Sequence, residues 1–156
     1  MGTRSLTRII PRQEGLSYSD GHTRGELALV NAYQQYDGYP EYMAVQYAEW
    51  LEGISVGNVL SGEPRLLSQK RDPMMHAYAN TAGCFAAQFV AKFKDTPGNF
   101  YLHKIDNELG WVEYIYTLYP KVGHETYMSI YHVASRSVVF VGKPAKALEK
   151  YKINTK

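Results

Sequence analysis

The sequence predicts an α+β fold, in which an antiparallel sheet packs against two main helices. Apolar residues recur at helical spacing in two stretches, residues 40–53 and 75–94. From residue 99 onward the pattern changes to alternation with a period of two, which is typical of strands. The chain has 156 residues, 45% of them hydrophobic and 21% charged, which fits one domain with its own core. We therefore expect a single domain over residues 1–156.

The N-terminal part is expected to add two strands to this sheet. Residues 4–10 alternate loosely between polar and apolar side chains and stop at Pro11. Residues 26–36 form a second apolar stretch that ends in a turn sequence, Asp-Gly-Tyr-Pro. Gly and Ser cluster between the two stretches, which predicts a loop over residues 13–25.

Two amphipathic helices follow. Pro40 suits the first helical turn, because its fixed φ fits the helix and its missing N–H is not needed there. A long polar loop, residues 57–73, separates the two helices. Their apolar stripes are expected to face the sheet, with four large aromatic residues in the core: Trp50, Phe85, Phe89 and Phe93.

The C-terminal part predicts a meander of four antiparallel strands and a short terminal helix over residues 145–151. The strands cover residues 99–105, 111–119, 126–133 and 136–141, and short turns join them. We expect four tyrosines on one face of this meander: Tyr114, Tyr116, Tyr127 and Tyr131. Such an aromatic face predicts a homodimer or a higher homo-oligomer, because symmetric pairing would cover it.

Charge is concentrated at the C-terminus. The formal net charge is +2, and residues 143–156 hold five lysines against one glutamate. A whole-domain nucleic-acid binder usually carries a basic stripe and a pI above about 9. The sequence therefore favours a solvated basic tail over a nucleic-acid partner.

Several classes of function are disfavoured by what the sequence lacks. Cys84 is the only cysteine, which excludes a disulfide framework and a multi-cysteine metal site. The first residues lack the apolar run of a signal peptide, and no stretch reaches the roughly 18 apolar residues of a membrane span. Phosphate-loop, nucleophile-elbow and zinc-protease motifs are also missing. We expect a cytoplasmic protein without membrane attachment, catalytic residues, metal or cofactor.

The most distinctive segment is the predicted turn before the first helix. It reads either as a structural corner or as an anion site, in which backbone N–H groups at the helix start bind phosphate and tyrosines stack on a base. In both interpretations Gly38 allows a positive φ, and in the second one an arginine of the long loop clamps a second phosphate. The candidate ligand-binding residues are Tyr36, Asp37, Gly38, Tyr39, Arg65 and Arg71.

Four sequence segments carry a resemblance. They are Tyr-Asp-Gly-Tyr-Pro at 36–40, Gly-Cys-Phe-Ala-Ala-Gln-Phe-Val-Ala-Lys-Phe-Lys at 83–94, Pro-Gly-Asn-Phe-Tyr-Leu at 97–102 and Glu-Tyr-Ile-Tyr at 113–116. In order and spacing they resemble a family of small proteins of tailed phages and prophages. The order of elements also resembles the phage anti-Thoeris sponges, small α+β oligomers that sequester cyclic ADP-ribose signals. The resemblance implies an accessory, anti-defence role in the host cytoplasm.

Three classes of function remain open from the sequence. The first is a non-enzymatic protein that binds and sequesters a nucleotide-type signal. The second is a phage protein that binds a host protein or a phage structural partner through a tyrosine-rich surface. The third is a small hydrolase or nuclease, for which the compact acidic group Asp106, Glu108 and Glu113 would supply the carboxylates.

Overall fold

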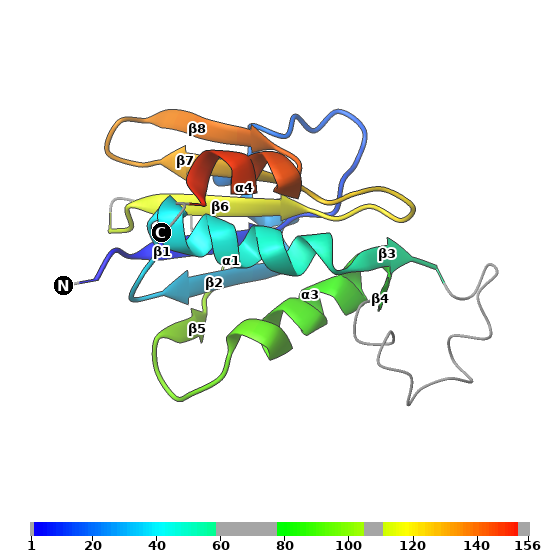
Figure 1. Ribbon diagram of the computed structural model, residues 1–156, viewed down its shortest axis with the longest axis horizontal. Coiled ribbons are helices and arrows are strands. Elements are labelled where there is room, and N and C mark those ends of the chain that lie inside the picture. The colour runs from blue at the N-terminus through cyan, green and yellow to red at the C-terminus, as the bar shows by residue number, and fades with distance from the viewer. Residues whose placement is uncertain (1, 59–77, 105–110, 153–156) are drawn as a thin grey trace.

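The residues described by a computed structural model form a six-stranded mixed sheet with three α-helices on one face (Figure 1). The structure describes residues 2–58, 78–104 and 111–152. The α+β class expected from the sequence is confirmed. Within the described residues, no helix is both long enough and apolar enough to cross a membrane.

The strands of the main sheet lie in the order β5-β2-β1-β6-β7-β8. All neighbours are antiparallel except β1 and β6, which are parallel. The strands are β1 Ser5–Ile9, β2 Val30–Gln34, β5 Phe100–Leu102, β6 Tyr114–Tyr119, β7 Tyr127–His132 and β8 Ser137–Gly142. The two short strands β3 Ser55–Gly57 and β4 Tyr78–Asn80 form a separate parallel pair.

The predicted four-strand meander is wrong in its first strand. Strands β6, β7 and β8 do form consecutive antiparallel neighbours. Strand β5, however, pairs with β2 at the opposite edge, where Phe100 lies opposite Gln34 and Leu102 opposite Ala32. Strands β2 and β1 therefore lie between β5 and β6 in the sheet, a long-range arrangement that alternation in the sequence does not reveal.

The helices are α1 Pro40–Glu52, α3 Thr81–Phe93 and α4 Pro144–Tyr151. Proline occupies the first turn of α1 and α4, as its fixed φ favours. Helix α3 begins later than the expected residue 75. Tyr78–Asn80 form strand β4 instead, because they pair with β3, and Thr81 has a positive φ of 66° at the start of the helix.

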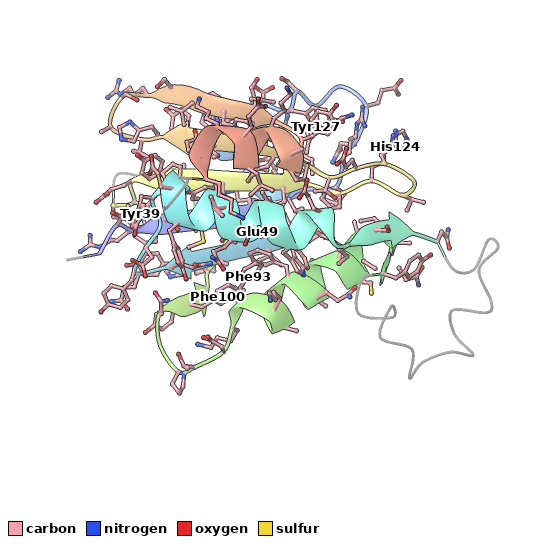
Figure 2. All side chains as sticks on the ribbon, viewed as in Figure 1. Tyr39, Glu49, Phe93, Phe100, His124 and Tyr127 are labelled. Atoms are coloured by element: carbon pink, nitrogen blue, oxygen red, sulfur yellow. The ribbon has the colours of Figure 1, made fainter. Side chains whose placement is uncertain are left out.

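Aromatic side chains fill the space between the helices and the sheet. Phe85 and Phe89 are fully buried, and Trp50 and Phe93 are partly buried against the same cluster. The ring centroid of Phe89 lies 5.0 Å from that of Phe93 and 6.0 Å from that of Phe100. Figure 2 shows Phe93 and Phe100 beside the space between α1 and α3. The expected aromatic core is thus present on the helix face.

Part of the opposite face of the sheet, over β6 and β7, is covered by the connection between β1 and β2 (Figure 1). This connection, residues 10–29, contains the two 3-10 turns Gly21–Thr23 and Gly25–Leu27, and we call it the cover segment. Gly21 lies so close to the Thr117 side chain that a Cβ atom there would lie 2.6 Å from the Thr117 Cβ. From the sequence, a loop, a ligand or a second copy of the chain could cover this face. In the structure a loop covers part of it.

The expected tyrosine face does not form. The register places Tyr116 opposite Ile130 and Ile115 opposite Tyr131, so Tyr114 and Tyr116 lie on one face of the sheet and Tyr127 and Tyr131 on the other. Tyr116 packs against Tyr47 of α1 on the helix face, whereas Tyr131 stacks on His22 of the cover segment. The surface argument for a homo-oligomer is therefore lost, and self-association stays a prediction.

Candidate functional site

The turn between β2 and α1 is a tightly held corner. Its positive φ, 60°, falls on Asp37, whereas the sequence argument assigned it to Gly38. Gly38 is required for another reason: a Cβ atom there would lie 2.7 Å from the Ser5 Cβ and 2.9 Å from the Thr3 carbonyl oxygen. The Tyr116 hydroxyl also donates a hydrogen bond to the Gly38 carbonyl. Close approach to β1 and β6 therefore explains the glycine.

The backbone of this corner is largely engaged in internal hydrogen bonds. The Gly38 N–H donates to the Thr3 carbonyl at 2.9 Å, and Pro40 has no N–H. The N–H groups of Tyr42 and Met43 both donate to the Tyr39 carbonyl, at 3.0 and 2.8 Å. Recognition of a ligand at this corner therefore depends on side chains more than on the backbone amides that the sequence argument invoked.

A pocket of about 250 Å³ opens beside the corner, between the first half of α1 and the end of α3. We call it the corner pocket. The rings of Tyr36 and Tyr42 stand at its rim, 50% and 42% exposed, and buried Met43 contributes apolar surface. The pocket is lined by Gln34, Tyr36, Asp37, Tyr42, Met43, Gln46, Lys92, Phe93, Asp95 and Asn99.

Hydrogen bonds to the segment after β2 and to helix α1 fix two of the lining residues. Asn99 adopts a positive φ of 62°, and its Oδ1 accepts the N–H groups of Gln35 and Tyr36, each at 3.0 Å. The Gln34 amide donates to the Tyr47 hydroxyl at 2.9 Å. Burial raises the pKa of Tyr47 above its ordinary value, so this hydroxyl stays protonated. The wall of the corner pocket is therefore preorganised.

The structure brings together part of the candidate site. Tyr36 and Asp37 line the corner pocket. Tyr39 is 40% exposed beside it, with its ring centroid 6.3 Å from that of Tyr42, and Gly38 holds the turn. Arg65 and Arg71 lie outside the described residues. Sequence reasoning missed the residues that α1, α3 and the turn before β5 add: Tyr42, Gln46, Lys92, Asp95 and Asn99.

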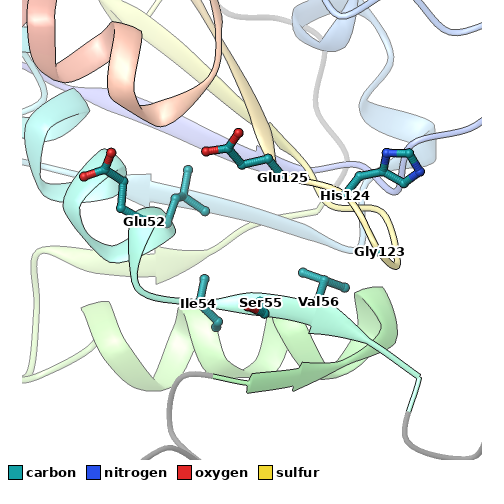
Figure 3. Close-up of a pocket in the computed structure, with 8 residues that line it drawn as sticks. Glu52, Ile54, Ser55, Val56, Gly123, His124 and Glu125 are labelled. Carbon is teal, nitrogen blue, oxygen red and sulfur yellow. The ribbon is translucent and has the colours of Figure 1, made fainter. Parts of the chain in front are cut away.

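A second pocket, of about 600 Å³, lies at the other end of α1 (Figure 3). Leu51, Ile54 and Val56 give it an apolar side, and the turn between β6 and β7 closes it with His124 and Glu125. In Figure 3 the His124 ring points away from the Glu125 carboxylate. The Glu125 Oε1 atom instead lies 3.8 Å from the Lys143 Nζ atom. The Glu125 carboxylate and the His124 imidazole of this pocket thus do not converge as a general acid–base pair would.

Several charged groups elsewhere have polar partners. Four lysines of the basic tail do: Lys143 with Glu125, Lys146 with Glu149, Lys150 with the Val139 carbonyl and Lys152 with Glu49. Across the part of the chain that the structure describes, no three His, Cys, Asp or Glu side chains are grouped as a metal site would need. Of the candidate hydrolase carboxylates, Glu113 is exposed, and Asp106 and Glu108 lie outside the described residues.

Comparison with known proteins adds no relative to this picture. No family model, no curated protein and no solved structure matches the chain. The resemblance to a phage and prophage family therefore stays a prediction, and the functional argument depends on the corner pocket itself.

Proposed function

We propose that the chain is a non-enzymatic binding protein that takes a nucleotide-type ligand in the corner pocket. The observation that supports this most directly is the convergence of two half-exposed tyrosine rings, amide side chains and one lysine on a single pocket. Tyrosine faces stack on bases, amides can hydrogen-bond base edges, and a lysine ammonium attracts phosphate. In this proposal the protein acts by sequestration, in the anti-defence setting that its resemblance to phage sponges implies.

The size of the pocket favours a compact ligand. Ligand pockets commonly measure about 300–1,000 Å³, and the corner pocket of about 250 Å³ lies just below this range. We therefore expect one base and its sugar to sit between Tyr36 and Tyr42, with the phosphate towards Lys92 at the open side. Asp37 and Asp95 on the same rim disfavour a second phosphate, because they repel it.

Calorimetric titration with AMP, GMP, ADP-ribose and cyclic ADP-ribose tests this proposal. Tyr42→Ala and Lys92→Gln should each weaken binding by about tenfold or more, since a base–aromatic stack alone contributes about 1–3 kcal/mol. Tyr101→Ala and Lys121→Gln are the matched controls, because both residues are exposed and do not line the pocket. Both controls should bind as the parent does.

A protein partner is the second candidate for the same surface. Tyr36, Tyr39 and Tyr42 are 50%, 40% and 42% exposed around one corner, and tyrosine clusters are frequent centres of protein interfaces. A folded parent that binds none of the four nucleotides would contradict the first proposal. Loss of a co-purified host protein on Tyr39→Ala and Tyr42→Ala would then favour the second.

A further inference from the structure

The two edges of the main sheet are closed in a similar way. Strands β5 and β8 form these edges, and an edge strand offers unpaired N–H and C=O groups to any other strand. At each edge, a lysine from the neighbouring helix end donates a hydrogen bond to a carbonyl group of the strand.

At β5 the backbone itself completes the closure. The Phe100 N–H donates to the Gly98 carbonyl at 2.7 Å. The Lys94 ammonium donates to the Phe100 carbonyl at 3.0 Å and to the Gly98 carbonyl at 3.2 Å. Both polar backbone groups of Phe100, the first residue of this three-residue strand, are thereby occupied. This edge offers little to an added strand.

At β8 the closure depends on one side chain. The strand has six residues, Ser-Val-Val-Phe-Val-Gly, without a charge or a proline. Its register shifts between Val138 and Phe140, so Val139 is the extra residue of a bulge. The Lys150 ammonium, 5.4 Å from the centroid of the Tyr151 ring, donates to the Val139 carbonyl at 2.8 Å.

We infer that Lys150 keeps the β8 edge closed, and that a chain without this ammonium group pairs β8 with the β8 strand of a second copy. Antiparallel pairing of one strand with itself is two-fold symmetric, so both copies satisfy the same backbone groups. Such pairing would also cover part of Val138 and Val141, which are 36% and 42% exposed. Lysine on an edge strand is a common means of preventing this association, and here α4 supplies the lysine.

Mass measured by light scattering after size exclusion, from low to high micromolar concentration, tests the inference. Lys150→Met keeps the apolar stem and removes the donor, and it should double the mass relative to the parent as concentration rises. Lys150→Arg keeps a cationic donor and should match the parent. Lys146→Met is the control on the same helix, since the Lys146 side chain is 72% exposed and pairs only locally with Glu149.

A second variant locates the contact. Adding Val141→Lys to Lys150→Met places a charge on the proposed interface and should restore the mass of the parent. Thermal melts monitored by circular dichroism should show all variants folded, because Lys150 and Val141 are exposed. Equal masses for Lys150→Met and Lys146→Met would overturn the inference, as would a doubled mass that Val141→Lys leaves unchanged.

Discussion

The two faces of the sheet are stabilised by different interactions. The helix face is covered by α1, α3 and α4 through a continuous apolar cluster. The other face has only a small apolar cluster, Leu6, Val112 and Ile115, and is covered in part by the cover segment. The cover segment lacks long regular elements and is held by a few specific contacts. The buried Arg8 side chain donates to the carbonyls of Gly21 and His22, at 3.1 and 3.0 Å. The His22 and Tyr131 rings stack with centroids 3.7 Å apart.

This difference has a consequence for stability. Contacts on the helix face are mostly apolar, so truncation of one side chain lowers the free energy of unfolding mainly through the cavity it leaves. On the other face, individual polar and ring contacts hold an irregular stretch of chain, which favours local opening below the free energy of global unfolding. Variants on the two faces should therefore differ in both the size and the extent of their effects.

The largest effect is expected on the helix face. Phe89 is fully buried, and Phe89→Ala should lower the free energy of unfolding by about 3–5 kcal/mol. Denaturant titration measures this change. Val122→Ala, at a residue 43% exposed, is the control and should change stability by no more than about 0.5 kcal/mol. Equal midpoints for the two variants would show that the stripe of α3 does not carry the core.

A smaller and more local effect is expected from Arg8→Met. Two carbonyls of the cover segment lose their charged donor, which should cost about 1–3 kcal/mol. Hydrogen exchange monitored by mass spectrometry should speed up over the cover segment while α1 and α3 stay protected. Arg24→Met is the control within that segment, because its exposed ion pair with Glu26 contributes little. An equal rise in exchange over the cover segment, α1 and α3 would contradict the local opening of the cover segment.

What could be predicted from the sequence follows the same division. The stripe containing Phe85 and Phe89 is a local pattern, and so is the hairpin alternation of β6, β7 and β8; both predictions are confirmed. The parallel pairing of β1 with β6 and the place of β5 beside β2 join distant segments, and no local periodicity indicates them. Within the cover segment, residues 13–25 were expected only as a loop, because their contacts are made by single residues such as His22. Residues 26–29 were expected as the start of a strand, and this is wrong: Gly25–Leu27 form a 3-10 turn and β2 begins at Val30.

The candidate site divides in this way too. Turn chemistry before Pro40 led to Tyr36 and Asp37, which do line the corner pocket. Lys92 and Asn99 come from other elements, and only the packing of α3 and β5 brings them there. The sequence placed the positive φ at Gly38, the residue that tolerates it best. The structure has it at Asp37, and Gly38 is needed instead for close approach to Ser5.

The smallest effect is expected from pH on the cover segment. Burial lowers the pKa of His22 below its ordinary value of 6.5, and the Arg8 charge lowers it further, against the opposing effect of Asp20. The folded state therefore favours the neutral ring, and the unfolded chain binds the proton first as pH falls. Stability should thus be lost between pH 6.5 and the lowered pKa, and no further loss from this residue should occur below that value.

Urea titrations of the parent and of His22→Gln across this pH range measure that loss. His22→Gln should show a shallower fall in the unfolding midpoint, since it has no proton to bind at this position. His124→Gln, at an exposed residue in the turn between β6 and β7, should keep the slope of the parent. Protection factors in the cover segment, which correct for the intrinsic slowing of exchange in acid, should also fall with acid in the parent and not in His22→Gln. An identical pH dependence of the unfolding midpoint in the parent and in His22→Gln would contradict this prediction. It would mean that the stack of His22 on Tyr131 tolerates the charged ring, and that the hydrogen bonds of Arg8 remain the feature in which this face differs from the helix face.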